Sequence, residues 1–352
     1  HRQRPSRASG TVSFFTPITD HARTLVDESG PLRAVDRTHP EDARVPELLV
    51  ATFYRFIRLE RHAALKAPLE ACCEANEVRG TILLASEGIN ATIAGTRRGV
   101  MAVLEHLARD ERLADLTWRE SRAEVPPFRR MRIRLKREIV TMGVPDIDPA
   151  RLAGTYVEPA DWNALIDDPG VIVIDTRNDY EVTLGTFKNA IDPEIAAFRE
   201  LPKWLEARID PARRPRVAMF CTGGIRCEKS TALLKQAGVH EVFHLEGGIL
   251  RYLEEIPAEE SLWEGQCFVF DERVSVGPGL EVGGLELCRA CGWAIEAEGR
   301  RSPRYRAGVS CHRCKGNTTP DQKRRFAERQ RQFEASRNPT NASPAPPDGG
   351  NA

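Results

Sequence analysis

The chain has 352 residues, of which 41% are hydrophobic and 29% are charged, and its formal net charge is zero. This length suits about two or three domains, and the composition excludes a collagen-like or wholly disordered chain. No apolar run approaches the ~18 residues that a membrane span needs, so we expect no membrane insertion. The nine cysteines, an odd number, and the lack of a visible secretory hydrophobic segment favour the cytoplasm, where thiols stay reduced and either react or bind metal.

Two basic regions flank an acidic one. Residues 119–137 hold eight basic and two acidic side chains and residues 300–331 hold eleven and two, whereas residues 155–275 hold 13 basic and 22 acidic ones. Most of the basic residues are arginine, whose planar guanidinium binds phosphate through paired hydrogen bonds. A high arginine content also follows from genome composition, but its clustering indicates a polyanionic partner.

The first half of the chain predicts an arm and one domain. Residues 1–46 show no hydrophobic period, so we expect a disordered arm, although an arginine- and serine-rich start is also typical of a transit peptide. The pattern then predicts a strand over 48–59, a helix over 62–76, two short strands within 81–94, a helix over 97–109, and strands near 117–122 and 130–140. We interpret this as a βαββαβ order, which is typical of a ferredoxin-like or acylphosphatase-like α+β sandwich over 47–145.

The last of these strands carries a basic stripe. Its cations alternate with Met131, Ile133 and Leu135, and we predict that the apolar three face the core while the cations share the other face. Such a face is either ordinary solvated surface or a phosphate-binding surface for nucleic acid. The candidate binding residues are Arg130, Arg132, Arg134 and Lys136.

Residues 155–262 predict a second domain. Buried strands over 171–174, 217–220 and 242–245 alternate with helices over 228–236 and after Gly247-Gly248. This alternation predicts a doubly wound parallel α/β sheet, whose ligands bind beyond the carboxyl ends of the strands. Cys221 lies at such an end.

The segment after this strand is Cys221-Thr222-Gly223-Gly224-Ile225-Arg226. The glycines permit a positive φ, so that the amides of Thr222–Arg226 can form an anion cradle. The start of the next helix and the guanidinium of Arg226 add positive charge, and all three effects favour the reactive thiolate. We therefore predict that Cys221 is a nucleophile facing a pocket that a substrate can enter.

The positions of the other cysteines suggest a separate role for each group. Cys227 is either a second thiol that closes a disulfide with Cys221 or a buried helical residue. In residues 263–335, two C-x-x-C pairs separated by 19 residues predict a structural zinc site, with reduced thiols or redox pairs as the alternative; the four are Cys288, Cys291, Cys311 and Cys314. We expect Cys72, Cys73 and Cys267 to be packing residues, and residues 336–352 to be disordered.

Several segments together resemble known families. Residues 175–191 and 242–248 resemble rhodanese signatures, in which the loop cysteine carries a persulfide. Three segments in this order then resemble the oxygen-dependent tRNA uridine hydroxylase family: Ala85–Gly95 (ASEGINATIAG), Cys221–Ser230 (CTGGIRCEKS) and Gly265–Val274 (GQCFVFDERV).

The resemblance implies hydroxylation of the wobble uridine (position 34) at C5, with dioxygen as oxidant, tRNA bound by its anticodon loop, and Cys221 as the active-site cysteine. The sequence shows no flavin or nicotinamide motif and no facial iron triad. Two alternatives are a sulfurtransferase that carries a persulfide on Cys221 and a non-catalytic RNA-binding adaptor. The oligomeric state does not follow from the sequence.

Overall fold

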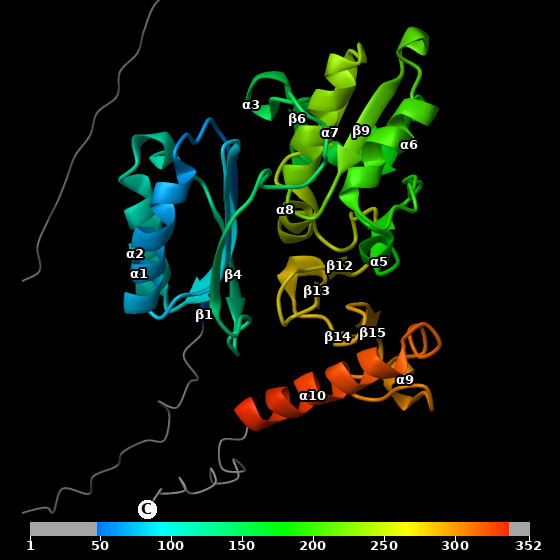
Figure 1. Cartoon of the computed structure of the whole chain (residues 1–352). Helices are drawn as coiled ribbons and strands as arrows, with labels where there is room; N and C mark the ends of the chain where they lie inside the picture. The colour runs from blue at the N-terminus through cyan, green and yellow to red at the C-terminus, as the bar shows by residue number, and fades with distance from the viewer. Residues whose placement is uncertain (1–47, 338–352) are drawn as a thin grey trace, which may run out of the picture. The chain divides into compact units, whose positions relative to one another are not determined.

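The computed structural model describes residues 48–337 (Figure 1). The predicted arm over 1–46 and residues 338–352 of the predicted tail lie outside the described residues, whereas residues 336 and 337 end α10 (Pro320–Arg337). Within residues 48–337, no helix has both the length and the apolar character to cross a membrane.

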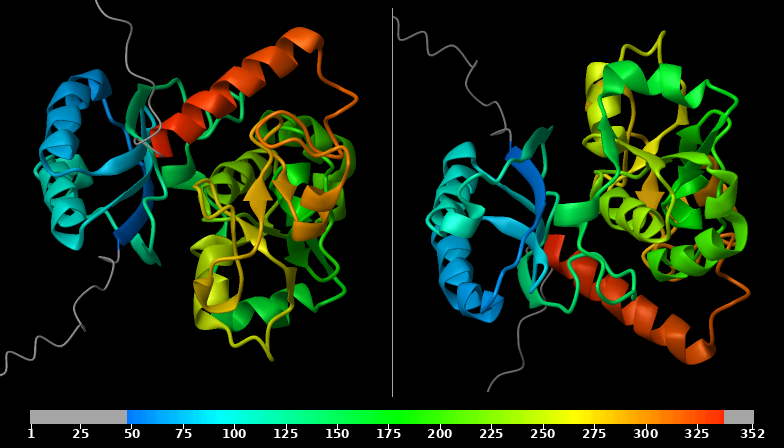
Figure 2. Two further views of the ribbon diagram at one scale, coloured as in Figure 1. Left: turned by 90° about the horizontal axis from the view of Figure 1, so that it is seen from below. Right: turned by 90° about the horizontal axis from the view of Figure 1, so that it is seen from above.

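The N-terminal domain is an α+β sandwich, as predicted. Its sheet has the order β4-β1-β3-β2-β5, with β5 parallel to β2 and the other pairs antiparallel. The five strands match the five predicted strand segments, but the βαββαβ pattern holds only four; the extra strand is β5, at the β2 edge. Helices α1 and α2 cover one face of the sheet (Figure 2). The elements are β1 (Leu48–Phe56), α1 (Lys66–Ala75), β2 (Arg79–Ala85), β3 (Gly88–Gly95), α2 (Arg97–Ala108), β4 (Arg119–Ala123) and β5 (Met131–Leu135).

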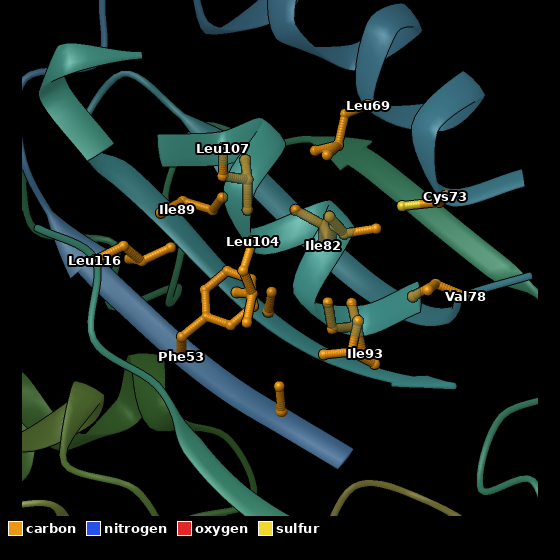
Figure 3. Close-up of a cluster of buried hydrophobic side chains, with 14 of the residues drawn as sticks. Phe53, Leu69, Cys73, Val78, Ile82, Ile89, Ile93, Leu104, Leu107 and Leu116 are labelled. Atoms are coloured by element: carbon orange, nitrogen blue, oxygen red, sulfur yellow. The ribbon is translucent and has the colours of Figure 1, made fainter. Parts of the chain in front are cut away.

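The core of this domain lies between the sheet and the two helices (Figure 3). Helix α2 begins where the Thr96 hydroxyl accepts a hydrogen bond from the Gly99 amide at 3.1 Å, which satisfies one free amide of the first turn. Four of its apolar residues recur at helical spacing on one face and are buried: Val100, Val103, Leu104 and Leu107. Cys73 of α1 is buried in the same core and Cys72 is half-buried, in agreement with a packing role.

The basic strand β5 differs from the prediction at one position. Ile133 is buried and Met131 is half-buried, but Leu135 is 44% exposed. Strand β5 is an edge strand that ends at Leu135, so fewer neighbours pack against that side chain. The prediction that all three apolar residues face the core is therefore wrong for Leu135.

The second domain has the predicted parallel sheet, in the order β6-β10-β9-β7. Helix α7 begins at residue 225, three residues before the predicted start. The strands are β6 (Thr155–Val157), β7 (Val171–Asp175), β9 (Arg216–Phe220) and β10 (Glu241–Leu245). The helices are α3 (Pro149–Leu152), α4 (Pro159–Ile166), α5 (Asp179–Val182), α6 (Leu201–Arg208), α7 (Ile225–Gln236) and α8 (Gly248–Glu255).

Short elements make up the C-terminal region. The first of them, β11 (Trp263–Gly265), pairs with β8 (Gly185–Phe187) of the second domain. Two further hairpin pairs follow, and the chain continues into the long helix α10. These remaining elements are β12 (Cys267–Phe268), β13 (Ser275–Val276), β14 (Glu286–Leu287), β15 (Ala294–Ile295) and α9 (Ala297–Arg301).

Candidate active site

Cys221 follows β9 directly, and its sulfur accepts a hydrogen bond from the Gly224 amide at 3.1 Å. Gly224 has a φ of 97°, a left-handed conformation that glycine adopts without steric cost, and α7 begins after it. The first turn of α8 holds the loop from the other side, because the Ile249 amide donates to the Cys221 carbonyl at 3.0 Å. Gly248 is required at this approach, since a Cβ there would lie 2.5 Å from the Cys221 carbonyl oxygen.

The loop stabilises Cys221 as a thiolate. Burial raises the pKa of Cys221, but the hydrogen bond from the Cys227 thiol, the charge of Arg226 and the amides of both residues lower it to about 6. Burial and the neighbouring Cys221 sulfur raise the pKa of Cys227 well above its ordinary value. At neutral pH the pair is therefore a thiolate beside a thiol, with the proton on Cys227.

The other residues of the predicted anion cradle differ in conformation and contacts. Only Gly224, and not Gly223, adopts a positive φ. Ile225 packs beside the small cluster formed by Phe56, Ala85 and Ile139. Thr222 is buried and its hydroxyl donates to Glu181 at 3.2 Å.

Glu181 belongs to the segment 175–191 that resembles a rhodanese signature, but the sequence analysis assigned it no role in the site. Its carboxylate binds the Arg226 guanidinium through two hydrogen bonds of 2.6 and 2.7 Å. Burial raises the pKa of Glu181, but the charge and hydrogen bonds of Arg226 hold it below its ordinary value. Arg226 therefore acts as half of a buried ion pair, and its position depends on Glu181.

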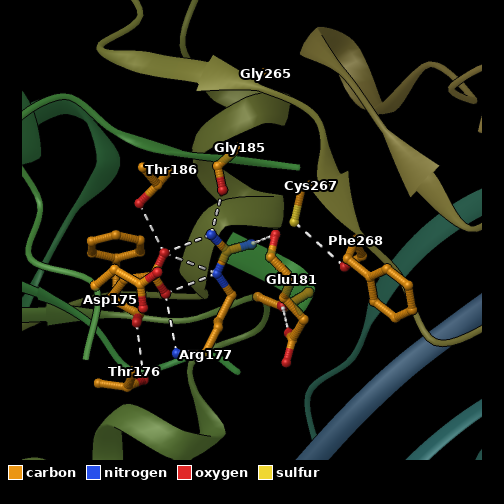
Figure 4. A network of polar contacts seen from close by, with 12 residues as sticks. Asp175, Thr176, Arg177, Glu181, Gly185, Thr186, Gly265, Cys267 and Phe268 are labelled. Atoms are coloured by element: carbon orange, nitrogen blue, oxygen red, sulfur yellow. Dashed lines mark hydrogen bonds and ion pairs between the residues drawn. The ribbon is translucent and has the colours of Figure 1, made fainter. Parts of the chain in front are cut away.

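A second buried ion pair holds the end of β7 (Figure 4). Arg177 binds Asp175 through Nη2 at 2.6 Å and Nε at 2.9 Å, and Thr186 donates to the same carboxylate at 2.9 Å. The hydroxyl oxygen of Thr176, which lies between Asp175 and Arg177 in the sequence, is 3.5 Å from the Cys227 sulfur. The network fixes the strand end against which Cys227 packs. Cys267, also in Figure 4, is fully buried, and burial raises its pKa to about 12, in agreement with a packing role.

The expectation that Cys221 faces an open pocket is wrong for this structure, because the residue is 0% exposed. Side chains of the N-terminal domain cover the loop. The Tyr54 hydroxyl donates to Glu228 of α7 at 2.7 Å and lies against Gly224, and the Arg119 guanidinium lies against Gly247. Sequence periodicity within one domain carries no information on what the other domain places over it.

A buried ion pair holds the N-terminal domain, whose Tyr54 and Arg119 cover the Cys221 loop, against α7. Lys229 Nζ of α7 lies 2.8 Å from Glu87 and 2.5 Å from Glu138, and it also donates to the Val140 carbonyl at 3.1 Å. Glu87 accepts a hydrogen bond from the Ile139 amide at 2.6 Å. These contacts join the turn between β2 and β3 to the helix that follows the reactive cysteine.

The four predicted basic residues in and beside β5 are all exposed, and two of them line a pocket. Arg130 and Arg132 line an open pocket of about 630 Å³ together with residues of the C-terminal region. Arg134 and Lys136 are not among the residues that line this pocket. The pocket wall also includes aromatic side chains, which the sequence did not single out.

The structure gathers the four C-terminal cysteines into one cluster, with all sulfurs within 4.8 Å of one another. Sulfur–sulfur distances are 3.9 Å for Cys288–Cys314, 3.8 Å for Cys291–Cys311 and 3.8 Å for Cys311–Cys314. A tetrahedral ion with Zn–S bonds of ~2.3 Å requires sulfurs about 3.8 Å apart. The cluster therefore has the dimensions to hold a metal ion.

Comparison with known proteins gives matches to both domains. The UPF0176 acylphosphatase like domain matches residues 48–139 and the rhodanese-like domain matches residues 158–255. A tRNA uridine(34) hydroxylase of Albidiferax ferrireducens is 62% identical over 82% of this chain and 92% of that protein. Proteins of the same name are 58% identical in Acaryochloris marina, over 82% of this chain and 93% of the relative, and 59% identical in Mesorhizobium japonicum, over 81% and 92%.

Proposed function

The chain belongs to the tRNA uridine(34) hydroxylase family, and from this premise we propose that Cys221 is the thiolate through which it hydroxylates uridine 34 of tRNA. The observation that carries the proposal is a sulfur with a pKa of about 6 held by loop amides and a charged arginine. A thiolate in such a loop is a strong nucleophile at neutral pH. Arg226 and Glu181 act as positioning residues for that loop.

Hydroxylation at C5 by dioxygen needs two electrons from elsewhere. One oxygen atom replaces the C5 hydrogen as a hydroxyl group, and the other leaves as water after taking two electrons and two protons. We propose that Cys221 and Cys227 supply the two electrons by closing into a disulfide, because the two thiols lie close enough to shift each other's pKa. One proton comes from the Cys227 thiol and the other from solvent. A cellular thiol then reduces the disulfide and restores the pair.

The buried position of Cys221 sets a condition on this chemistry. The base reaches the sulfur only when the side chains over the loop, Tyr54 and Arg119, move away from the glycines that they cover. The closed arrangement protects the thiolate from unproductive oxidation when no substrate is bound. We therefore propose that substrate binding and the opening of the cover are coupled.

We propose the anticodon loop of tRNA as the part bound, because it holds position 34, and the cytoplasm as the compartment, because tRNA and reduced thiols meet there. The exposed arginines of β5 supply contacts to phosphate groups. Binding that depends on several phosphates weakens steeply as salt rises.

We propose a structural zinc ion for the four-cysteine cluster. The sulfur spacing fits a tetrahedral ion, and hydrogen bonds from the Cys291 thiol and from the amides of Cys291 and Ala290 lower the pKa of Cys288, which favours the thiolate that a metal binds. Held by all four residues, the ion replaces the hydrophobic core that so small a region lacks. It leaves no open coordination position for substrate.

The test is hydroxylation of tRNA by the purified protein under ¹⁸O₂, with a thiol reductant. The proposal predicts one ¹⁸O atom in 5-hydroxyuridine at position 34 and none when Cys221→Ser replaces the wild-type protein. Label from H₂¹⁸O in the product would contradict the use of dioxygen. Transfer of sulfane sulfur from thiosulfate without any hydroxylation would favour the sulfurtransferase alternative.

A further inference from the structure

Four aromatic rings form a continuous row along the open pocket that Arg130 and Arg132 line. Trp293 lies 6.2 Å from Tyr180, Tyr180 lies 5.3 Å from Phe268, and Phe268 lies 5.2 Å from Phe270, all measured between ring centroids. The last ring is 60% exposed, which is unusual for phenylalanine. A row of rings that ends in an exposed one offers a surface on which unpaired bases can stack.

The lining of the pocket is also rich in cations. Arg129, Arg130, Arg132, Arg289 and Arg329 all line it, against the two acids Asp271 and Glu272.

Both acids are already engaged by arginine. Asp271 binds Arg273 at 2.7 Å, and Glu272 binds Arg129 at 3.4 Å and Arg289 at 2.8 Å. Among the described residues, Arg130 and Arg132 have no such carboxylate partner. Their charges are therefore available to an anion that enters the pocket.

The pocket lies next to the reactive loop. The Phe270 ring centroid is 6.0 Å from the guanidinium carbon of Arg226, and Tyr180 immediately precedes Glu181, which holds Arg226. A base on Phe270 would thus lie beside the residue that stabilises the Cys221 thiolate. The volume of about 630 Å³ falls within the ~300–1,000 Å³ that is usual for ligand sites.

We propose that this pocket binds unstacked nucleotides of the anticodon loop that neighbour position 34, with a base on Phe270 and phosphates at Arg130 and Arg132. The inference rests on the proposed function and names the surface that presents its substrate. Stacking on aromatic rings together with arginine–phosphate contacts is how proteins bind single-stranded RNA loops. Double-stranded RNA would leave the aromatic row unused, so a loop is the better match.

The test measures binding of an anticodon stem-loop by fluorescence anisotropy to the full chain carrying substitutions in the pocket. Loss of one stacked base costs ~1–3 kcal/mol, so Phe270→Ala should weaken binding by about 5- to 150-fold. Phe270→Trp should retain most of the affinity because indole also stacks. Val282→Ala is the matched control: Val282 is 59% exposed and does not line the pocket, so binding should be unchanged.

A second pair of variants tests the cations of the pocket lining. Arg132→Ala should lower the affinity and reduce the salt slope by about one, whereas Arg134→Ala, two residues along the same strand, should have a smaller effect. Equal losses for both would show that β5 is a general basic surface and would overturn the pocket assignment.

The outcomes separate this inference from the proposed function. Cys221→Ser should abolish hydroxylation yet bind the stem-loop as the wild type does. If Phe270→Ala binds and hydroxylates normally while Cys221→Ser is inactive, the pocket assignment is wrong and the proposed function stands. If Cys221→Ser still hydroxylates uridine 34, the proposed function is wrong whatever Phe270 does.

Discussion

Lys229 Nζ lies 2.8 Å from Glu87 Oε2, and the lysine side chain is almost completely buried. Glu87 belongs to the segment Ala85–Gly95 and Lys229 to the segment Cys221–Ser230, two of the segments on which the family resemblance rests. The ion pair therefore joins the N-terminal domain to the helix that follows the reactive cysteine. This contact gives a physical reason for both motifs to carry charged residues.

We predict that Lys229→Met destabilises the protein strongly, because it leaves Glu87 and Glu138 without their buried partner. Breaking a buried ion pair costs about 3–5 kcal/mol, which urea unfolding measures. Lys66→Met is the control, since Lys66 forms an exposed pair with Glu70 at 3.7 Å and such pairs contribute about 0–1 kcal/mol. Equal effects of the two substitutions would contradict the assignment.

The same substitution tests whether the cover protects Cys221. Lys229→Met should loosen the N-terminal domain over the loop, so iodoacetamide should alkylate Cys221 faster than in the wild type under native conditions. Peptide mass spectrometry identifies the modified cysteine. An unchanged rate in a protein that remains folded would show that the buried charge does not hold the cover.

The reactivity of Cys221 should follow its lowered pKa of about 6. Because the thiolate is the reactive form, the alkylation rate should rise as pH increases through about 6 and level off by neutral pH. The difference in thiolate absorbance between wild type and Cys221→Ser reports the same midpoint. A midpoint near the ordinary cysteine value of ~8.5 would contradict the described electrostatics.

Cys227→Ser separates the two roles given to Cys227. A serine hydroxyl can still donate a hydrogen bond, so the pKa of Cys221 should stay low, whereas Cys227→Ala should raise it. Hydroxylation should fail in both variants because neither can close a disulfide. Full activity of Cys227→Ser would exclude the two-thiol source of electrons.

Gly248→Ala should disturb the loop through the backbone. Gly248 has a φ of 67°, and a Cβ would lie 2.5 Å from the Cys221 carbonyl oxygen, so the strain is unavoidable. We expect a lower melting temperature and a higher pKa of Cys221. For Gly223→Ala, nothing lies within 4 Å of the added Cβ, so the melting temperature should be unchanged.

The zinc assignment predicts about one ion per chain by elemental analysis of protein purified without chelators. Cys291→Ser should lower both the zinc content and the thermal stability, because a four-thiolate site tolerates loss of a ligand poorly. Cys267→Ser should leave the zinc content unchanged, since Cys267 lies outside the cluster. If wild-type protein without zinc had the full thermal stability, the cluster would not be a structural zinc site.

Local sequence was sufficient for features that depend on neighbouring residues. The Cys221 turn, the alternation of β5 and the two C-x-x-C pairs are short-range patterns, and the structure places each as a unit. The partners of these units come from distant segments. The ion pair between Arg226 and Glu181 and the contact of Tyr54 with Gly224 both result from tertiary packing. The periodicity of the sequence does not encode such contacts.

The same limit explains the two differences in exposure. Leu135 fits the apolar face by alternation, but it stands at the end of an edge strand. Cys221 fits the exposed end of a parallel strand, but another domain covers it. In both cases the local pattern is correct and the surroundings decide the exposure.

The most direct test of Cys221 as the hydroxylating thiol is mass spectrometry of tRNA nucleosides from a strain that lacks this gene. Complementation with the wild-type chain should restore 5-hydroxyuridine at position 34, and Cys221→Ser, expressed at the same level, should restore none. Restoration by Cys221→Ser at the wild-type level would contradict the role given to this thiolate.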